Sequence, residues 1–94
     1  MTELIARIDA RADMPTHVAW LDVMRSLGID ADNVLSVFEV VRVERGNWDV
    51  TELRLRECVL TEDGRKQVHP DDPHEIWTKP LDVLVPDGIE LPTA

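Results

Sequence analysis

One short segment carries the side chains that metal-dependent hydrolases use. Residues 69–74 read His-Pro-Asp-Asp-Pro-His, so imidazole and carboxylate groups that suit zinc, iron or manganese lie close together. The candidate ligands are His69, Asp71, Asp72 and His74. Two prolines dictate the backbone of this segment, and no distant third ligand is evident in the sequence. We therefore interpret it as a solvated acidic loop, expect no metal ligand, and rank a metal-dependent hydrolase as the least favoured function.

The other reactive side chains lack the partners that catalysis requires. Cys58 has no histidine near it in the sequence that could act as a base, so a small buried residue is the preferred interpretation. The carboxylate pair Glu62 and Asp63 lies in a turn, where solvation accounts for it. The chain also lacks a Gly-rich phosphate loop and a nucleophile elbow. The sequence predicts no catalytic residue, no cofactor and no enzymatic activity.

Charge and composition exclude several classes of partner. Ten basic residues against nineteen acidic ones give a formal net charge of −9, which opposes binding to nucleic acid and to anionic lipid. The longest apolar run, residues 18–21, is far shorter than the roughly twenty residues of a membrane span. Residues 1–7 do not resemble a secretory signal, and a single cysteine suits a reducing compartment. We expect a cytoplasmic protein that binds neither nucleic acid nor membrane.

The elements that must position any functional residue indicate one α+β domain. Ninety-four residues, 44% of them hydrophobic, suffice for one core and are too few for two. We divide the chain into a helical part, 1–29, a sheet part, 34–85, and an acidic, proline-rich tail, 86–94. The change of apolar period after residue 33 separates the first two parts. The sequence predicts one or two N-terminal helices packed on a small, mainly antiparallel sheet of three to four strands.

One or two helices are expected in the first part. Apolar residues at helical spacing in segment 2–12 predict a short first helix with Thr2 as its N-cap. Residues 14–16, with Pro15, interrupt that pattern. The second helix follows, because apolar residues recur at i, i+3, i+4 and i+7 and Gly28 then ends the pattern. Its apolar face consists of Trp20, Val23, Met24 and Leu27.

A β-hairpin is expected in the sheet part. Segments 34–45 and 48–60 have strand-like patterns, and the dipeptide Gly46-Asn47 between them suits a type II′ turn. This turn places Val40 opposite Leu53 on the face toward the helix, with Phe38 opposite Leu55. A shift by one residue would turn these side chains away from the core. Further strands are expected over residues 65–69 and, as an edge strand between prolines, 81–85.

The opposite face of the hairpin has no evident cover. Val41 and Val43 lie on it with Trp48, which follows the turn directly, while Trp77 lies between the acidic loop and Pro80. Either Trp77 and the last strand fold over this face, or a partner protein covers it, because exposed tryptophan beside apolar residues is typical of interfaces. Val41, Val43, Trp48 and Trp77 are therefore the candidate partner-binding residues.

The order of segments resembles that of small uncharacterised proteins encoded by actinobacterial phages and prophages. The resemblance rests on Trp20–Asp30, on Val34–Val37, on Glu62–Arg65 and on the acidic, proline-rich stretch after them, and it covers roughly residues 16–85. An excess of arginine over lysine agrees with a GC-rich genome. No catalytic motif is known for that group, so the resemblance implies a context in the bacterial host and no site residue.

These observations together favour a non-catalytic protein-binding module, a phage or prophage accessory protein that engages a host or virion protein. The alternatives are a structural or accessory subunit of the virion and an acidic inhibitor that mimics DNA. The DNA mimic requires an ordered array of carboxylates, whereas the acidic excess here lies in the last third of the chain. Pairing of strand edges could also join copies of the chain into a homo-oligomer.

Overall fold

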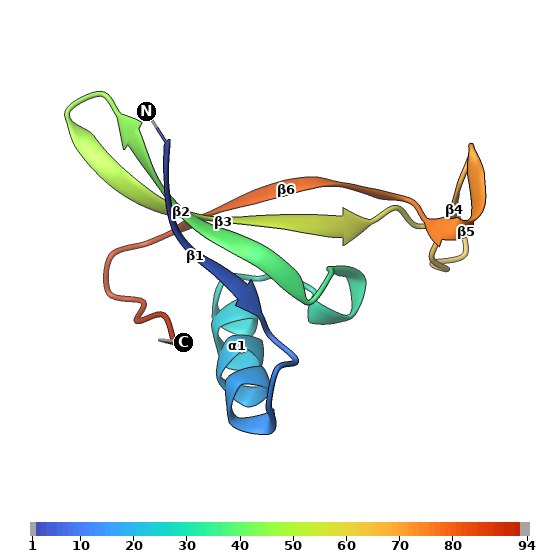
Figure 1. The fold of residues 1–94 in the computed structure, drawn as a ribbon, viewed down its shortest axis with the longest axis horizontal. Helices are drawn as coiled ribbons and strands as arrows, with labels where there is room; N and C mark the ends of the chain where they lie inside the picture. Colours follow the sequence, from blue (N-terminus) through green and yellow to red (C-terminus); the bar gives the residue numbers. More distant parts are fainter. Residues whose placement is uncertain (1, 93–94) are drawn as a thin grey trace.

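The computed structural model describes residues 2–92 and shows a small α+β fold with one α-helix (Figure 1). Four strands form a sheet in the order β1-β2-β3-β6, with every neighbouring pair antiparallel, and β4 and β5 form a separate two-stranded sheet. The elements are β1 (Thr2–Asp9), α1 (Met14–Ser26), the 3-10 turn η1 (Ala31–Asn33), β2 (Val37–Arg45), β3 (Trp48–Cys58), β4 (Val68–His69), β5 (Asp72–Ile76) and β6 (Thr78–Val85).

The first predicted helix is wrong, because Thr2–Asp9 is the edge strand β1. It pairs with β2, and Ile8 lies opposite Phe38 in the core. The register shifts between Leu4 and Ala6, so one extra residue interrupts the alternation of a regular strand. The resulting apolar spacing imitates that of a helix. The predicted helical part, 1–29, therefore contains a strand of the sheet followed by one helix.

The second predicted helix is confirmed as α1, but it begins earlier than expected. Asp13 is its N-cap, and its carboxylate accepts a hydrogen bond of 2.8 Å from the backbone N–H of Thr16. Pro15 lies in the first turn, where a missing N–H costs nothing, so segment 14–16 starts the helix rather than separating two helices. After the C-cap, Gly28 has a φ of 74°, a left-handed conformation that favours glycine.

The cap of α1 makes a prediction about pH. The hydrogen bond from the Thr16 backbone lowers the pKa of Asp13 below its ordinary value. This stabilisation is therefore present above the unfolded-state pKa of about 3.9 and is lost as the pH falls through the folded-state pKa. We expect Asp13→Asn to keep the cap but to flatten the acid side of the melting-temperature profile between about pH 2 and pH 6. An unchanged profile would show that Asp13 does not contribute to acid unfolding.

The predicted hairpin is confirmed in its register and in its turn type. Arg45 pairs with Trp48 and Val40 with Leu53, as the turn dipeptide predicts. Gly46 has a φ of 63°, whereas no non-glycine residue among those described has a positive φ. A positive φ at the first central position only is the pattern of a type II′ turn, whose twist matches that of the strands.

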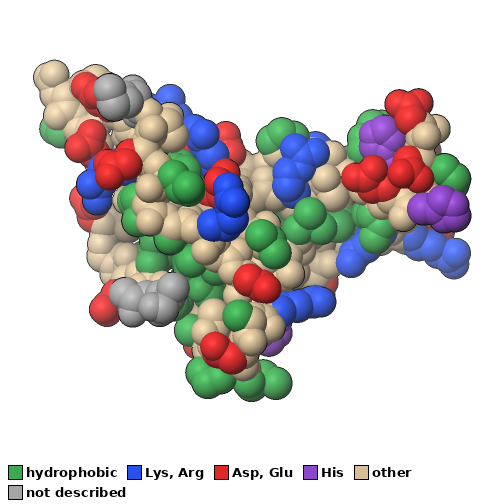
Figure 2. Space-filling model, in the orientation of Figure 1, with side chains coloured by type: hydrophobic (Ala, Val, Ile, Leu, Met, Phe, Trp, Pro, Cys, Tyr) green, Lys and Arg blue, Asp and Glu red, His purple; other side chains and the backbone are tan. Residues whose placement is uncertain are grey.

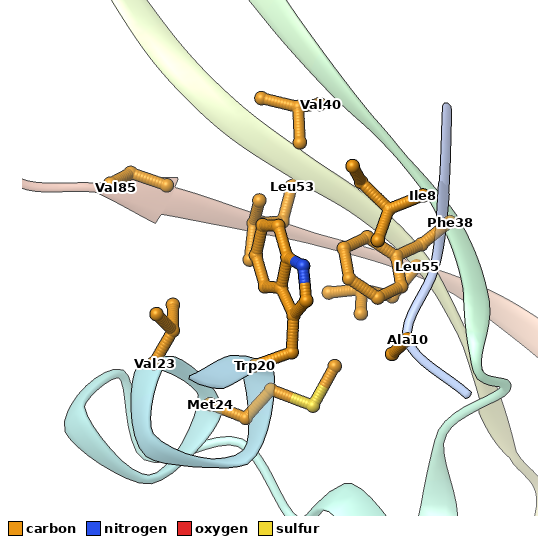
Figure 3. Close-up of a cluster of buried hydrophobic side chains, with 10 residues drawn as sticks. All are labelled: Ile8, Ala10, Trp20, Val23, Met24, Phe38, Val40, Leu53, Leu55 and Val85. Carbon is orange, nitrogen blue, oxygen red and sulfur yellow. The ribbon is translucent and has the colours of Figure 1, made fainter. Parts of the chain in front are cut away.

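One hydrophobic core lies between α1 and the sheet (Figure 3). Trp20 projects from the helix toward the strands, and its ring meets that of Phe38 edge to face, with centroids 4.9 Å apart and an interplanar angle of 82°. Leu53, on the central strand β3, is fully buried beneath it. Ile89 and Leu91 of the C-terminal tail also pack against this cluster. Helix and tail thus cover the same face of the sheet, which we call the inner face.

The last third of the chain differs in part from the expectation. Strand β6 contains the predicted strand 81–85 and pairs with β3 along the sheet edge. Segment 65–69 supplies only the two residues of β4, while β5 begins inside the stretch that we expected to be irregular. The two strands form an arm at the end of the molecule far from the β2–β3 turn (Figure 1). Residues 93 and 94 of the predicted tail lie outside the described residues.

Within residues 2–92, no helix combines the length and the apolar character that crossing a membrane would require.

Candidate protein-binding face

The sheet has a second face, which we call the outer face. Because side chains alternate along each strand, the residues that point away from α1 follow from the strand registers. They include Leu4 and Arg7 of β1, Val37, Glu39, Val41, Val43 and Arg45 of β2, Trp48, Val50, Glu52 and Arg54 of β3, and Asp82 and Leu84 of β6. Since α1 and the tail pack against the inner face, no helix among the described residues covers the outer face.

Large apolar side chains of the outer face are exposed to solvent, with Val37 of β2 (51%) among them. The exposed fractions are 52% for Leu4, 72% for Trp48 and 54% for Leu84, and these residues come from three different strands. Each is large enough to anchor a protein contact, and tryptophan is among the residues most enriched at the centres of interfaces. Sequence reasoning identified Trp48 but not Leu4 or Leu84, because the positions of β1 and β6 in the sheet were not known.

Val41 and Val43 lie on the same face as Trp48, as predicted, but they are buried. Their exposed fractions are 3% and 7%, although neither belongs to the core cluster beneath α1. Part of the cover is Arg45, whose guanidinium reaches the carboxylate of Glu52 at 2.8 Å. To do so it must pass the intervening pair Val43 and Val50, so its aliphatic stem shields them. Val41 and Val43 therefore offer almost no accessible surface to a partner.

Arg45 and Glu52 form an ion pair on the outer face. Glu52 is buried, and its hydrogen bond and negative charge raise the pKa of the Arg45 guanidinium. Arg45 itself is exposed, so one side of the pair faces solvent. The sequence offered no signal for this pair, because the two residues are not direct cross-strand partners.

Trp77 does not lie on the outer face. Its ring packs edge to face against His69, with centroids 6.2 Å apart, and its backbone N–H donates to the carbonyl of Gln67. His69 lies in β4, while Gln67 directly precedes β4 and Trp77 directly follows β5. These two strands form the arm, which lies far from the β2–β3 turn (Figure 1). The alternative in which Trp77 and the last strand fold over Val41 and Val43 is therefore wrong. Trp77 belongs to a different part of the surface from the other three candidate residues.

A row of charged side chains crosses the outer face from edge to edge. The strand registers place Arg7, Glu39, Arg54 and Asp82 side by side on β1, β2, β3 and β6, so the sign of the charge alternates. Arg7 and Glu39 form an ion pair at 3.2 Å. Arg54 and Asp82 form no ion pair with any described residue, and the Nε atom of Arg54 is buried without a hydrogen-bond partner.

The histidine and aspartate segment forms the tip of the arm. Nδ1 of His69 accepts a hydrogen bond of 3.1 Å from the backbone N–H of Asp71, and the Asp72 carboxylate accepts one of 2.9 Å from that of His74. Figure 2 shows acidic and histidine side chains at this outer end of the molecule. Among the described residues, no group of three or more potential ligands is arranged to hold a metal ion. These side chains stabilise a turn, as in Asx turns.

Two further predicted features can be placed. Cys58 is a buried free thiol at the end of β3. Acidic side chains do not gather into a surface of one sign on the outer face, where the charged row alternates. On the view in Figure 2, basic side chains likewise lie among the acidic ones over the sheet. This arrangement does not resemble the regular array of negative charge along a nucleic-acid backbone.

Comparison of the chain with protein-family models, with curated proteins and with solved structures finds no match.

Proposed function

We propose that this protein is a non-catalytic protein-binding module that contacts its partner through the outer face of the sheet. The observation that carries this proposal is that no helix within residues 2–92 packs over that face, together with exposed Leu4, Trp48 and Leu84. A sheet normally buries at least one apolar face, and here the inner face already serves that purpose. Large apolar side chains on a second face, rimmed by charges, are typical of a protein contact site.

The resemblance to proteins of actinobacterial phages and prophages supports a setting for this contact. In that setting the protein is an accessory protein in the bacterial cytoplasm, and its partner is a host protein, a virion protein or another copy of itself. The interspersed charges of the outer face do not favour a DNA mimic, since both signs alternate along the charged row.

The substitution Trp48→Ala separates partner binding from folding. Because the Trp48 side chain is mostly exposed, we expect the free energy of unfolding to change by less than about 0.5 kcal/mol. Loss of a buried interface aromatic should weaken partner binding by about 2 kcal/mol, which is roughly a 30-fold increase in Kd. Urea denaturation and titration of the complex measure the two quantities on one variant.

A photo-crosslinking amino acid at position 48 identifies the partner directly. We expect a covalent adduct from this position in cells, and the mass of the adduct then names the partner. Val18 serves as the control position, because it is also exposed but lies on α1, at the other side of the molecule. Adducts of equal yield from both positions, or from position 18 alone, would contradict the proposed function.

A further inference from the structure

The charged row of the outer face is complementary to itself. Its order across the sheet is Arg7, Glu39, Arg54 and Asp82, which is positive, negative, positive and negative. A two-fold axis that runs parallel to the strands, between β2 and β3, exchanges the first residue with the last and the second with the third. Two copies related by this axis would therefore place Arg7 against Asp82 and Glu39 against Arg54, so that four contacts between opposite charges form.

The neighbouring apolar row obeys the same symmetry. Leu4 on β1 and Leu84 on β6 occupy one row at opposite edges of the sheet, in register with Val41 and Glu52 of the central strands. The two-fold axis brings Leu4 of one copy onto Leu84 of the other, twice in each dimer. Both leucines are about half exposed in the single chain, so both would gain burial. The central residues of this row are already buried and add no new contact.

The exposed tryptophan belongs to the row beside the β2–β3 turn, which the row of Val43 and Val50 separates from the leucine row. Arg45 and Trp48 are cross-strand partners beside the β2–β3 turn, so the axis sets the position of Trp48 in each copy opposite the position of Arg45 in the other. The guanidinium of Arg45 is held at Glu52, so the indole would meet the aliphatic stem of Arg45 and gain burial there. The charged row, the leucine row and the row of Arg45 and Trp48 thus satisfy one symmetry operator, while Arg7–Glu39 and Arg45–Glu52 also form ion pairs within each chain.

Association through strand edges is less well supported. The β1 edge carries a register shift at Leu4/Ala6 and the charged residues Glu3 and Arg7, while the β6 edge contains Lys79 and Pro80. Irregular backbone, charge and proline are the features by which natural sheets prevent edge-to-edge pairing. The face of the sheet is therefore the better site for a second copy.

We infer that the outer face binds a second copy of this chain, in a symmetric dimer whose two-fold axis runs along the strands between β2 and β3. This inference rests on the proposed function of the same face and names its partner. The two sheets then pack face to face with nearly aligned strands, which is a common geometry for stacked sheets. Each copy keeps its helix on the side away from the dimer interface.

A charge-swap experiment tests whether the two copies are related by this two-fold axis. Glu39→Arg and Arg54→Glu are made in separate chains, and sedimentation equilibrium measures the mass of each chain and of their equimolar mixture. In either variant alone, the axis sets like charges against each other twice, so we expect dimerisation to weaken at least about 100-fold. In the mixture, each arginine at position 39 or 54 meets a glutamate of the other chain, and the dimer mass should return.

Arg54 is partly buried, so a second pair of variants guards against misfolding. Arg7→Glu and Asp82→Arg change exposed residues at the sheet edges and should show the same loss alone and the same recovery when mixed. Arg25→Glu on α1 is the matched control, because it reverses a charge away from the outer face and should leave the dimer unchanged. Circular dichroism spectra confirm that every variant is folded before its mass is measured.

The possible results separate this inference from the proposed function. A dimer that is lost in the single variants and recovered in the mixtures supports the inference. A dimer that persists in all variants, or that weakens equally in Arg25→Glu, overturns the proposed geometry. A wild-type chain that stays monomeric at about 0.5 mM also overturns it, since a specific dimer of this size should form there. If the monomer still gives a foreign adduct from position 48, the proposed function stands; with no adduct, both fail.

Discussion

Trp20→Ala is expected to lower the free energy of unfolding by about 3–5 kcal/mol. The indole is 2% exposed and is the largest side chain of the core, where it contacts the ring of Phe38 edge to face. The total stability of a domain of this size is only about 5–15 kcal/mol, so the variant should lose much of its cooperative unfolding transition. Urea denaturation followed by circular dichroism measures the change.

The contrast with Trp48→Ala makes this prediction specific. Both substitutions remove an indole, but only Trp20 lies between the helix and the sheet. Equal destabilisation by the two substitutions would mean that Trp48 is also buried within the chain. A loss of less than about 1 kcal/mol for Trp20→Ala would mean that α1 does not pack on the sheet as described.

Leu53→Ala and Leu84→Ala should differ strongly, although both remove the same atoms from adjacent strands. Leu53 lies on the inner face of β3 with an exposed fraction of 0%, so its truncation should cost about 2–5 kcal/mol of unfolding free energy. Leu84 lies on the outer face of β6 and is half exposed, so its truncation should cost less than about 0.5 kcal/mol in the monomer. At a concentration that favours the dimer, Leu84→Ala should instead weaken self-association.

The two leucines also show which face of the sheet is covered within the chain. Thermal melts at low protein concentration report on the monomer, and sedimentation at high concentration reports on the dimer. If Leu84→Ala proved as destabilising as Leu53→Ala at low concentration, the outer face would be covered by part of the same chain. The proposed interface would then not exist.

Local sequence information was enough to predict the hairpin and the helix. Gly46-Asn47 restricts the turn to a type that fixes the strand register, and the register then determines which side chains share a face. The apolar residues of α1 repeat at helical spacing, and its end at Gly28 follows from the freedom of glycine to adopt a positive φ. In both elements, the residues that determine the structure are neighbours in the sequence.

The elements that depend on distant partners were harder to predict. β1 is a strand because it pairs with β2, whose residues lie about thirty to forty positions further along the chain, and its register shift hides the alternation that would have identified it. The sequence left open whether Trp77 covers the outer face, because it does not show that Gln67 and His69 contact Trp77 in the arm. The arm depends on contacts between two irregular segments. Their apolar residues do not recur at the spacing of a helix or a strand, so hydrophobic periodicity does not predict it.

The candidate site was predicted in part for the same reason. The hairpin register alone places Val41, Val43 and Trp48 on one face, so these three could be grouped from the sequence. The charged row and the exposed leucines involve β1 and β6, whose positions beside the hairpin are set only by the complete sheet. The Arg45 side chain that reaches across Val43 comes from another row, a contact that strand alternation does not describe.

Hydroxyl-radical footprinting tests most directly whether the outer face is the binding surface. Oxidation is compared between the dilute monomer and the concentrated complex, with mass spectrometry to locate the modified residues. We predict that Leu4, Trp48 and Leu84 become protected together, while Met14 and Val18, which are exposed on α1, react equally in both samples. Protection of Met14 and Val18 with full reactivity at Trp48 would contradict the account, because it would place the interface on the helix.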